Sequence, residues 1–106
     1  PVQPPSLGEA QLDLARLESS ARLSRALRHR TAALARVARD QTLLASANRF
    51  AAMSITAYRA VASSLPNVFE AQRNAREVLA QYIDDVAAAW IANSTLRLFT
   101  LAPDSQ

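Results

Sequence analysis

The sequence contains no cysteine, no lysine and a single glycine, Gly8. The absence of cysteine excludes disulfides and thiolate metal sites. The scarcity of glycine and of β-branched residues, together with abundant alanine, opposes sheets and favours long helices. Long apolar runs are also missing, since none approaches the roughly 20 residues that a membrane-spanning helix needs. The composition therefore predicts an all-α fold.

A stretch without proline is long enough for a single very long helix. The chain has 106 residues, half of them hydrophobic, which suffices for one domain. Ser6 can cap the helix and Glu9 completes a capping box, and no proline or further glycine follows until after Ala60. Such a helix reaches about 80 Å, which is typical of a coiled coil or a long hairpin. We predict a disordered segment at 1–5, a helical hairpin at 6–101 (helix 7–61, tip 62–64, helix 65–99) and a disordered tail at 102–106.

The turn between the two helices is predicted near Ser64. The hydroxyls of Ser63 and Ser64 can accept from the free N–H groups of a first helical turn. Pro66 would lie in that turn, where its missing N–H costs nothing. Asn67 and Glu70 offer a second start with capping-box spacing. The second helix therefore begins within a few residues of Ser64.

Apolar residues recur on both arms with alternating steps of three and four, the spacing of a coiled-coil seam. On the first arm the predicted seam is Leu23, Leu27, Arg30, Leu34, Val37, Gln41, Leu44, Asn48, Ala51, Ile55 and Tyr58. On the second arm it is Val68, Ala75, Leu79, Tyr82, Val86, Ala89, Asn93 and Leu96. The two arms can pair along one antiparallel seam, so we predict a hairpin whose first helix is the longer.

Further apolar residues lie to one side of this seam. They are Leu43, Ala47, Phe50, Ala57 and Val61 on the first arm and Ile83, Ala87, Trp90 and Ile91 on the second. A pair of helices buries one stripe on each, so these side stripes need other partners. The arms are also unequal, which leaves residues 12–27 without an intramolecular partner. We expect self-association.

Nothing in the sequence predicts catalysis, a metal site or a cofactor. His29 is the only histidine, has no accompanying carboxylate cluster, and is interpreted as a surface residue. Asp84 and Asp85 are adjacent, so on a helix they diverge by about 100° and cannot act as a dyad on one substrate. We expect both to be solvated, with an arginine on the facing arm as a possible partner.

The first arm is rich in arginine. It carries Arg16, Arg22, Arg25, Arg28, Arg30, Arg36 and Arg39, with only Glu18 and Asp40 nearby. Such a face can bind nucleic acid or an anionic surface. Because no aromatic residues are interleaved and the net charge is only +3, a solvated helix face is the preferred interpretation, with nucleic-acid binding as an alternative.

The residues around the turn resemble those of the TolC-type outer-membrane efflux proteins. That family has Tyr-x-x-Gly-x-x-Ser-Leu-x-Asp-Val-Leu-x-Ala-Gln at the periplasmic tip of a helical hairpin. The matching residues here are Tyr58, Ser64, Leu65, Val68, Ala71 and Gln72, and the similarity continues through Tyr82-Ile83-Asp84-Asp85, Ala89-Trp90 and Leu96-Arg97-Leu98. Two departures from the pattern matter, because Val61 replaces the glycine and Asn67 replaces an acidic residue. The resemblance covers most of residues 22–101.

The resemblance implies a function. The chain would be a periplasmic hairpin, from the second repeat, of a trimeric efflux channel in the outer membrane of a Gram-negative bacterium. It would be a piece of a longer protein whose missing parts cross the membrane. The periplasmic adaptor of a tripartite pump would contact the tip residues Val61, Ala62, Ser63, Ser64 and Leu65.

Three further residues receive roles from the same resemblance. Asn67 and Glu70 would line the pore constriction. Tyr58 would hydrogen-bond a neighbouring hairpin and hold the pore closed, although a core aromatic with a wet hydroxyl explains it equally well. An alternative function for the whole chain is a freestanding dimerisation module, in which two hairpins form a four-helix bundle.

Overall fold

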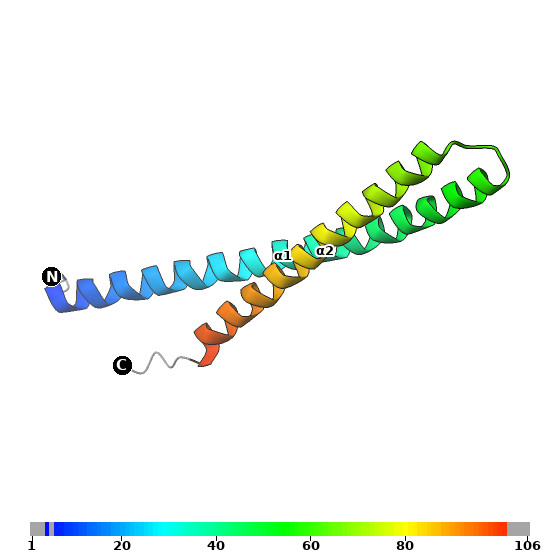
Figure 1. Ribbon diagram of the computed structural model, residues 1–106. Helices are drawn as coiled ribbons and strands as arrows, with labels where there is room; N and C mark the ends of the chain where they lie inside the picture. The colour runs from blue at the N-terminus through cyan, green and yellow to red at the C-terminus, as the bar shows by residue number, and fades with distance from the viewer. Residues whose placement is uncertain (1–3, 5, 102–106) are drawn as a thin grey trace.

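The computed structural model describes Pro4 and residues 6–101, and these form two helices packed as an antiparallel hairpin (Figure 1). Helix α1 spans Leu7–Arg59 and helix α2 spans Leu65–Leu101. The hairpin is a rod with extents of 88 × 27 × 15 Å. The predicted all-α hairpin with a longer first helix is confirmed. The disorder predicted for 1–5 and 102–106 falls, Pro4 apart, outside the described residues.

The start of α1 follows the predicted capping chemistry. Ser6 is the N-cap, and its Oγ accepts a hydrogen bond of 3.2 Å from the backbone N–H of Glu9. Glu9 also places a negative charge in the first turn, where the helix dipole favours it. At the other end, α1 stops at Arg59, two residues before the predicted boundary, and Ala60 is its C-cap.

The fully buried apolar residues of the seam are almost all alanine. In the described range seven apolar residues are buried, and six of them are alanines: Ala33, Ala47, Ala51, Ala71, Ala89, Ala92 and, as the exception, Val68. Alanine carries only a Cβ, so the two helices approach closely and little apolar surface is removed from water. The hairpin has a thin core.

The observed seam shares one of its two heptad positions with the predicted seam. The shared line runs through Arg30, Val37, Leu44 and Ala51 on α1 and through Val68, Ala75, Tyr82, Ala89 and Leu96 on α2. At the other position the prediction was one residue late. On α1, Ala33, Asp40 and Ala47 lie in the seam instead of the exposed Leu34, Gln41 and Asn48. On α2, Val78, Asp85 and Ala92 lie there, with Leu79 exposed and Val86 and Asn93 half-buried beside them. The small residues define the close contact and displace the larger ones to its edge.

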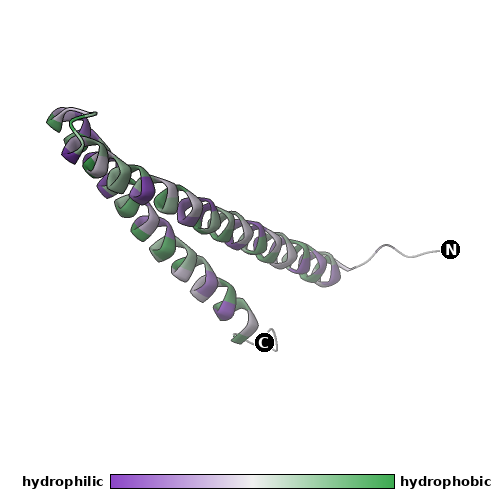
Figure 2. Ribbon diagram, turned by 90° about the vertical axis from the view of Figure 1, so that its right-hand side faces the viewer, coloured by the Kyte–Doolittle hydropathy of each residue, from purple (hydrophilic) through white to green (hydrophobic). Residues whose placement is uncertain are grey.

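The amino-terminal third of α1 projects beyond α2. Residues 7–25 are exposed except for the half-buried Ser19, and burial begins at Ala26. The free ends of the two helices also diverge in both views (Figures 1 and 2). As the unequal lengths predict, the leucines of this segment, Leu12 and Leu17 among them, have no intramolecular partner.

Neither helix in the described range has an apolar stretch long enough to cross a membrane.

Candidate functional site

The tip of the hairpin is a Schellman turn with valine in the place where glycine is usual. The N–H of Ala62 donates to the carbonyl of Ala57 (2.8 Å), and the N–H of Val61 donates to that of Tyr58 (2.9 Å). These are the two hydrogen bonds that define the motif, and they require a left-handed residue between the C-cap and Ala62. Val61 is that residue, with φ of 60°.

The conformation of Val61 is costly, and packing of its own side chain does not offset that cost. A left-handed residue with a Cβ costs roughly 1–2 kcal/mol, and β-branching makes the position a genuine outlier. The Val61 side chain is 91% exposed, so no packing within the hairpin offsets this cost. Strained residues of this kind concentrate at sites that contact a partner. The tip is therefore a candidate contact surface.

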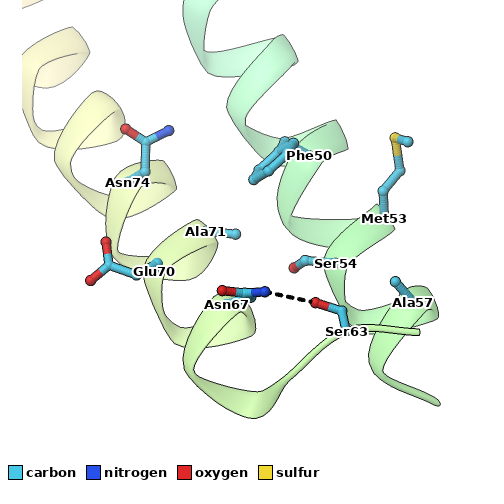
Figure 3. Close-up of a pocket in the computed structure, with 9 residues that line it drawn as sticks. All are labelled: Phe50, Met53, Ser54, Ala57, Ser63, Asn67, Glu70, Ala71 and Asn74. Atoms are coloured by element: carbon cyan, nitrogen blue, oxygen red, sulfur yellow. Dashed lines mark hydrogen bonds between the residues drawn. The ribbon is translucent and has the colours of Figure 1, made fainter. Parts of the chain in front are cut away.

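The rest of the tip leads directly into α2. Val68 donates its N–H to the carbonyl of Ser64 (3.4 Å), and Pro66 lies in the first turn as predicted. The half-buried Ser63 instead accepts from a side chain, because Asn67 Nδ2 donates to its Oγ at 3.2 Å (Figure 3). The second start predicted at Asn67 is not used, since α2 begins at Leu65.

The two predicted pore residues lie on α2 just behind the tip. Asn67 turns toward Ser63, whereas the Glu70 carboxylate points away from α1 (Figure 3). Glu70 is exposed and lies 3.8 Å from Arg73 Nη1 one turn later. Both residues line the same groove beside the tip, but their polar groups point in different directions. A ring of Asn67 and Glu70 requires further copies of the chain and stays a prediction.

An open groove of about 730 Å³ lies beside the tip, between α1 and α2. Its walls include Phe50, Met53 and Ala57 from α1 and Asn67 and Ala71 from α2 (Figure 3). Phe50 and Met53 are both exposed. Tyr58 follows the groove residue Ala57 in the sequence and is also exposed. Its predicted hydrogen bond to a neighbouring hairpin stays a prediction.

A buried pair of carboxyl groups lies at the middle of the seam. Asp40 of α1 is 1% exposed and Asp85 of α2 is 7% exposed. The expectation that both Asp84 and Asp85 are solvated was wrong for Asp85. It was drawn from neighbours along one helix, whereas the partner of Asp85 comes from the other. A signal was present in the sequence, because Asp40 lies seven residues after Ala33 and seven before Ala47.

Several polar groups surround this pair. Arg36 Nε lies 3.9 Å from Asp85 Oδ1, which bears out the expected arginine on the facing helix. Arg39 Nη2 lies 3.6 Å from Asp40 Oδ1, and Gln81 donates to Asp85 Oδ1 at 3.1 Å. The hydrogen bond with Asp85, followed by burial, raises the pKa of Asp40 above its usual value of 3.8. The hydrogen bonds from Asp40 and then Gln81 lower the pKa of Asp85.

The arginines of α1 are divided between the seam and the solvent. Besides Arg36, Arg30 reaches across the seam and its Nε donates to Asn93 Oδ1 at 3.1 Å. Arg22, Arg25 and Arg28 are exposed, as is His29. Within the range that the structure covers, no three histidine, aspartate or glutamate side chains gather into a potential metal site.

No protein-family model, curated protein or solved structure matches the chain. The fold places the described residues in the class of all-α helical hairpins and in no narrower class.

Proposed function

We propose that the chain is the periplasmic helical hairpin of an outer-membrane efflux channel of the TolC type, and that its tip engages the adaptor protein of a tripartite pump. Trimeric association would place hairpins side by side around a tunnel. Opening is a realignment of the hairpins that moves Asn67 and Glu70 off the pore axis. The proposal originates in the sequence resemblance around residues 58–72.

The observation that carries this proposal is the left-handed conformation of Val61. The family pattern has glycine at this position, and glycine adopts positive φ without strain. The turn here has the backbone that such a glycine serves, although the residue is valine. The resemblance and the backbone geometry therefore agree at the residue that departs from the pattern.

The exposed apolar surface supports the assembly part of the proposal. Twenty large hydrophobic side chains in the described range are exposed, against one, Val68, that is buried in the seam. Figure 2 shows apolar residues along both helices rather than confined to the contact between them. Such a surface is typical of an element that packs against further helices.

A crosslinking experiment tests the tip as the adaptor contact. The chain has no cysteine, so a photoreactive probe can be placed on Ser64→Cys alone. We expect adducts with the helical hairpin of a TolC-type periplasmic adaptor. The matched control is Gln11→Cys, an exposed position at the far end of α1, which should give none. Equal labelling from both positions, or none from Ser64→Cys across a panel of adaptors, would contradict the proposal.

A second candidate is a freestanding dimerisation module. It is favoured by the unpartnered segment 7–25, which two antiparallel copies could cover in a four-helix bundle. Light scattering distinguishes the two functions when combined with the crosslinking. A discrete dimer that gives no adaptor adducts supports the module, and adaptor adducts at the tip support the channel.

A further inference from the structure

Asp40 of α1 and Asp85 of α2 form a buried acidic pair at the middle of the seam. The two carboxyl groups come from different helices and face each other in the seam, one heptad away from the packed pair Ala33 and Ala92. Both are more than nine-tenths buried, and each has a buried Oδ2 atom with no hydrogen-bond partner in the described part of the chain. Two carboxylates offer only acceptors, so these groups can hydrogen-bond each other only when one of them carries a proton.

Full ionisation of this pair is unfavourable. Two like charges that share a buried site repel each other, and burial penalises each charge separately. From α1, Arg36 and Arg39 face the pair, and from α2 the neutral Gln81 does. Arg39 is mostly exposed and Arg36 partly so, so solvent screens both guanidinium groups. Asp84 is exposed and belongs to the solvent face.

We propose that Asp40 and Asp85 bind a single proton between α1 and α2, and that loss of this proton weakens the hairpin at its midpoint. The proton turns two repelling groups into a hydrogen-bonded acid and carboxylate. The large seam residues next to them, Val37, Leu44 and Tyr82, are only half-buried, so burial at this level offers limited resistance to separation. This proton site concerns the hairpin itself and does not rest on the channel assignment.

The direction of the pH dependence follows from the two groups. The pKa of Asp40 is raised, so its contribution is complete below the unfolded pKa and is lost as pH rises through the folded pKa. The pKa of Asp85 is lowered, so its contribution is present above the unfolded pKa and is lost as pH falls through the folded pKa. Stability from the pair is therefore greatest between these two folded-state pKa values.

Thermal unfolding by circular dichroism and carboxyl ¹³C NMR, both followed across pH on the full chain, test the proposal. We expect the wild-type Tm to fall by at least about 4 °C as pH rises from the acidic optimum through the raised pKa of Asp40. Asp40→Asn keeps a donor toward Asp85 but cannot lose a proton, so it should remove most of this fall. The matched control, Asp84→Asn, should retain it. The NMR should show two coupled titration steps for Asp40 and Asp85.

Two results would overturn the proposal. One is that Asp40 and Asp85 titrate independently, each at the usual carboxyl pKa. The other is that Asp40→Asn loses Tm with rising pH as steeply as Asp84→Asn does. If Asp40→Asn does not fold, Asp85→Asn replaces it in the same comparison, and the wild-type NMR titration decides the matter without any variant.

Discussion

At the scale of single residues, Val61 adopts a backbone conformation that its residue type disfavours. The Schellman hydrogen bonds of Ala62 and Val61 satisfy carbonyls that would otherwise be left free at the end of α1. They are obtained with a β-branched residue in left-handed conformation. The turn therefore carries a conformational free-energy cost at Val61, and one substitution at that position can remove it.

Replacement of Val61 by glycine should stabilise the hairpin. Relief of the left-handed strain gains roughly 1–2 kcal/mol, and the greater freedom of glycine in the unfolded chain takes back about 0.4–1 kcal/mol. We expect a net gain of roughly 0.5–1 kcal/mol, read from chemical denaturation. Ala62→Gly is the control, because the only positive φ of a non-glycine residue in the described range is at Val61. Ala62→Gly should lose stability. A large loss of stability for Val61→Gly would show that the left-handed conformation of Val61 is not strained.

At the scale of the helices, the alanine seam sets how closely α1 and α2 approach. Ala33 is fully buried, and together with Ala89 and Ala92 it forms a small cluster against which Val37 packs. A larger side chain in this cluster would have to push the helices apart. The seam therefore tolerates little increase in volume.

Enlarging a seam alanine should destabilise the hairpin. Ala33→Leu should cost roughly 1–3 kcal/mol, the usual penalty for overpacking. Ala32→Leu adds the same side chain one residue earlier, at an exposed position, and should change stability little. Thermal denaturation of the two variants side by side checks this, and an equal effect at both positions would contradict the observed register.

Much of the helical organisation could be predicted from the sequence. The Ser6 cap follows from local side-chain chemistry, and the hairpin follows from apolar periodicity. The start of α2 near Ser64 was also predicted, but the Ser63 hydroxyl accepts from the Asn67 side chain and not from a backbone N–H. The register was only half right because periodicity favours large residues such as Leu34 and Leu79. Close helix contact is decided by which residues are small, and this depends on both helices together.

The same limit explains the missed acidic pair. Asp40 and Asp85 are 45 residues apart in sequence and meet only through the seam. An aspartate in a helix is usually solvated, so the residue type predicts an exposed position, although the heptad spacing from Ala33 and Ala47 places Asp40 in the seam. The pair is visible only after the antiparallel register is known.

At the scale of the whole molecule, the hairpin has its small residues inside and its large ones outside. A second groove, of about 310 Å³, shows this on the flank, where Trp90 lies beside Leu34, Val37 and Val86. The Trp90 side chain is 68% exposed in the single hairpin. Burial of such a large aromatic side chain against another helix would stabilise an assembly of hairpins.

Removing this aromatic side chain should weaken association of the hairpin. Burial of a large apolar side chain contributes about 1.5–3 kcal/mol, so Trp90→Gln should raise the dissociation constant at least about tenfold. At concentrations that keep both proteins associated, the variant should be as helical as the wild type, because Trp90 is mostly exposed in one chain. Arg76→Gln, an exposed change on the same helix, is the control and should leave association unchanged. Sedimentation velocity gives the constants, and equal affinities for both variants would exclude this flank from the interface.

The most direct test of the central claim is sedimentation equilibrium of the purified chain, with helicity recorded on the same samples. A hairpin with an alanine core and, among its described residues, twenty exposed large hydrophobic side chains should not persist alone. We predict a strongly helical species whose mass is an integral multiple of 11.5 kDa, dissociating with loss of helicity on dilution. A fully helical monomer of 11.5 kDa at the highest attainable concentration would contradict the claim that this hairpin is built to assemble.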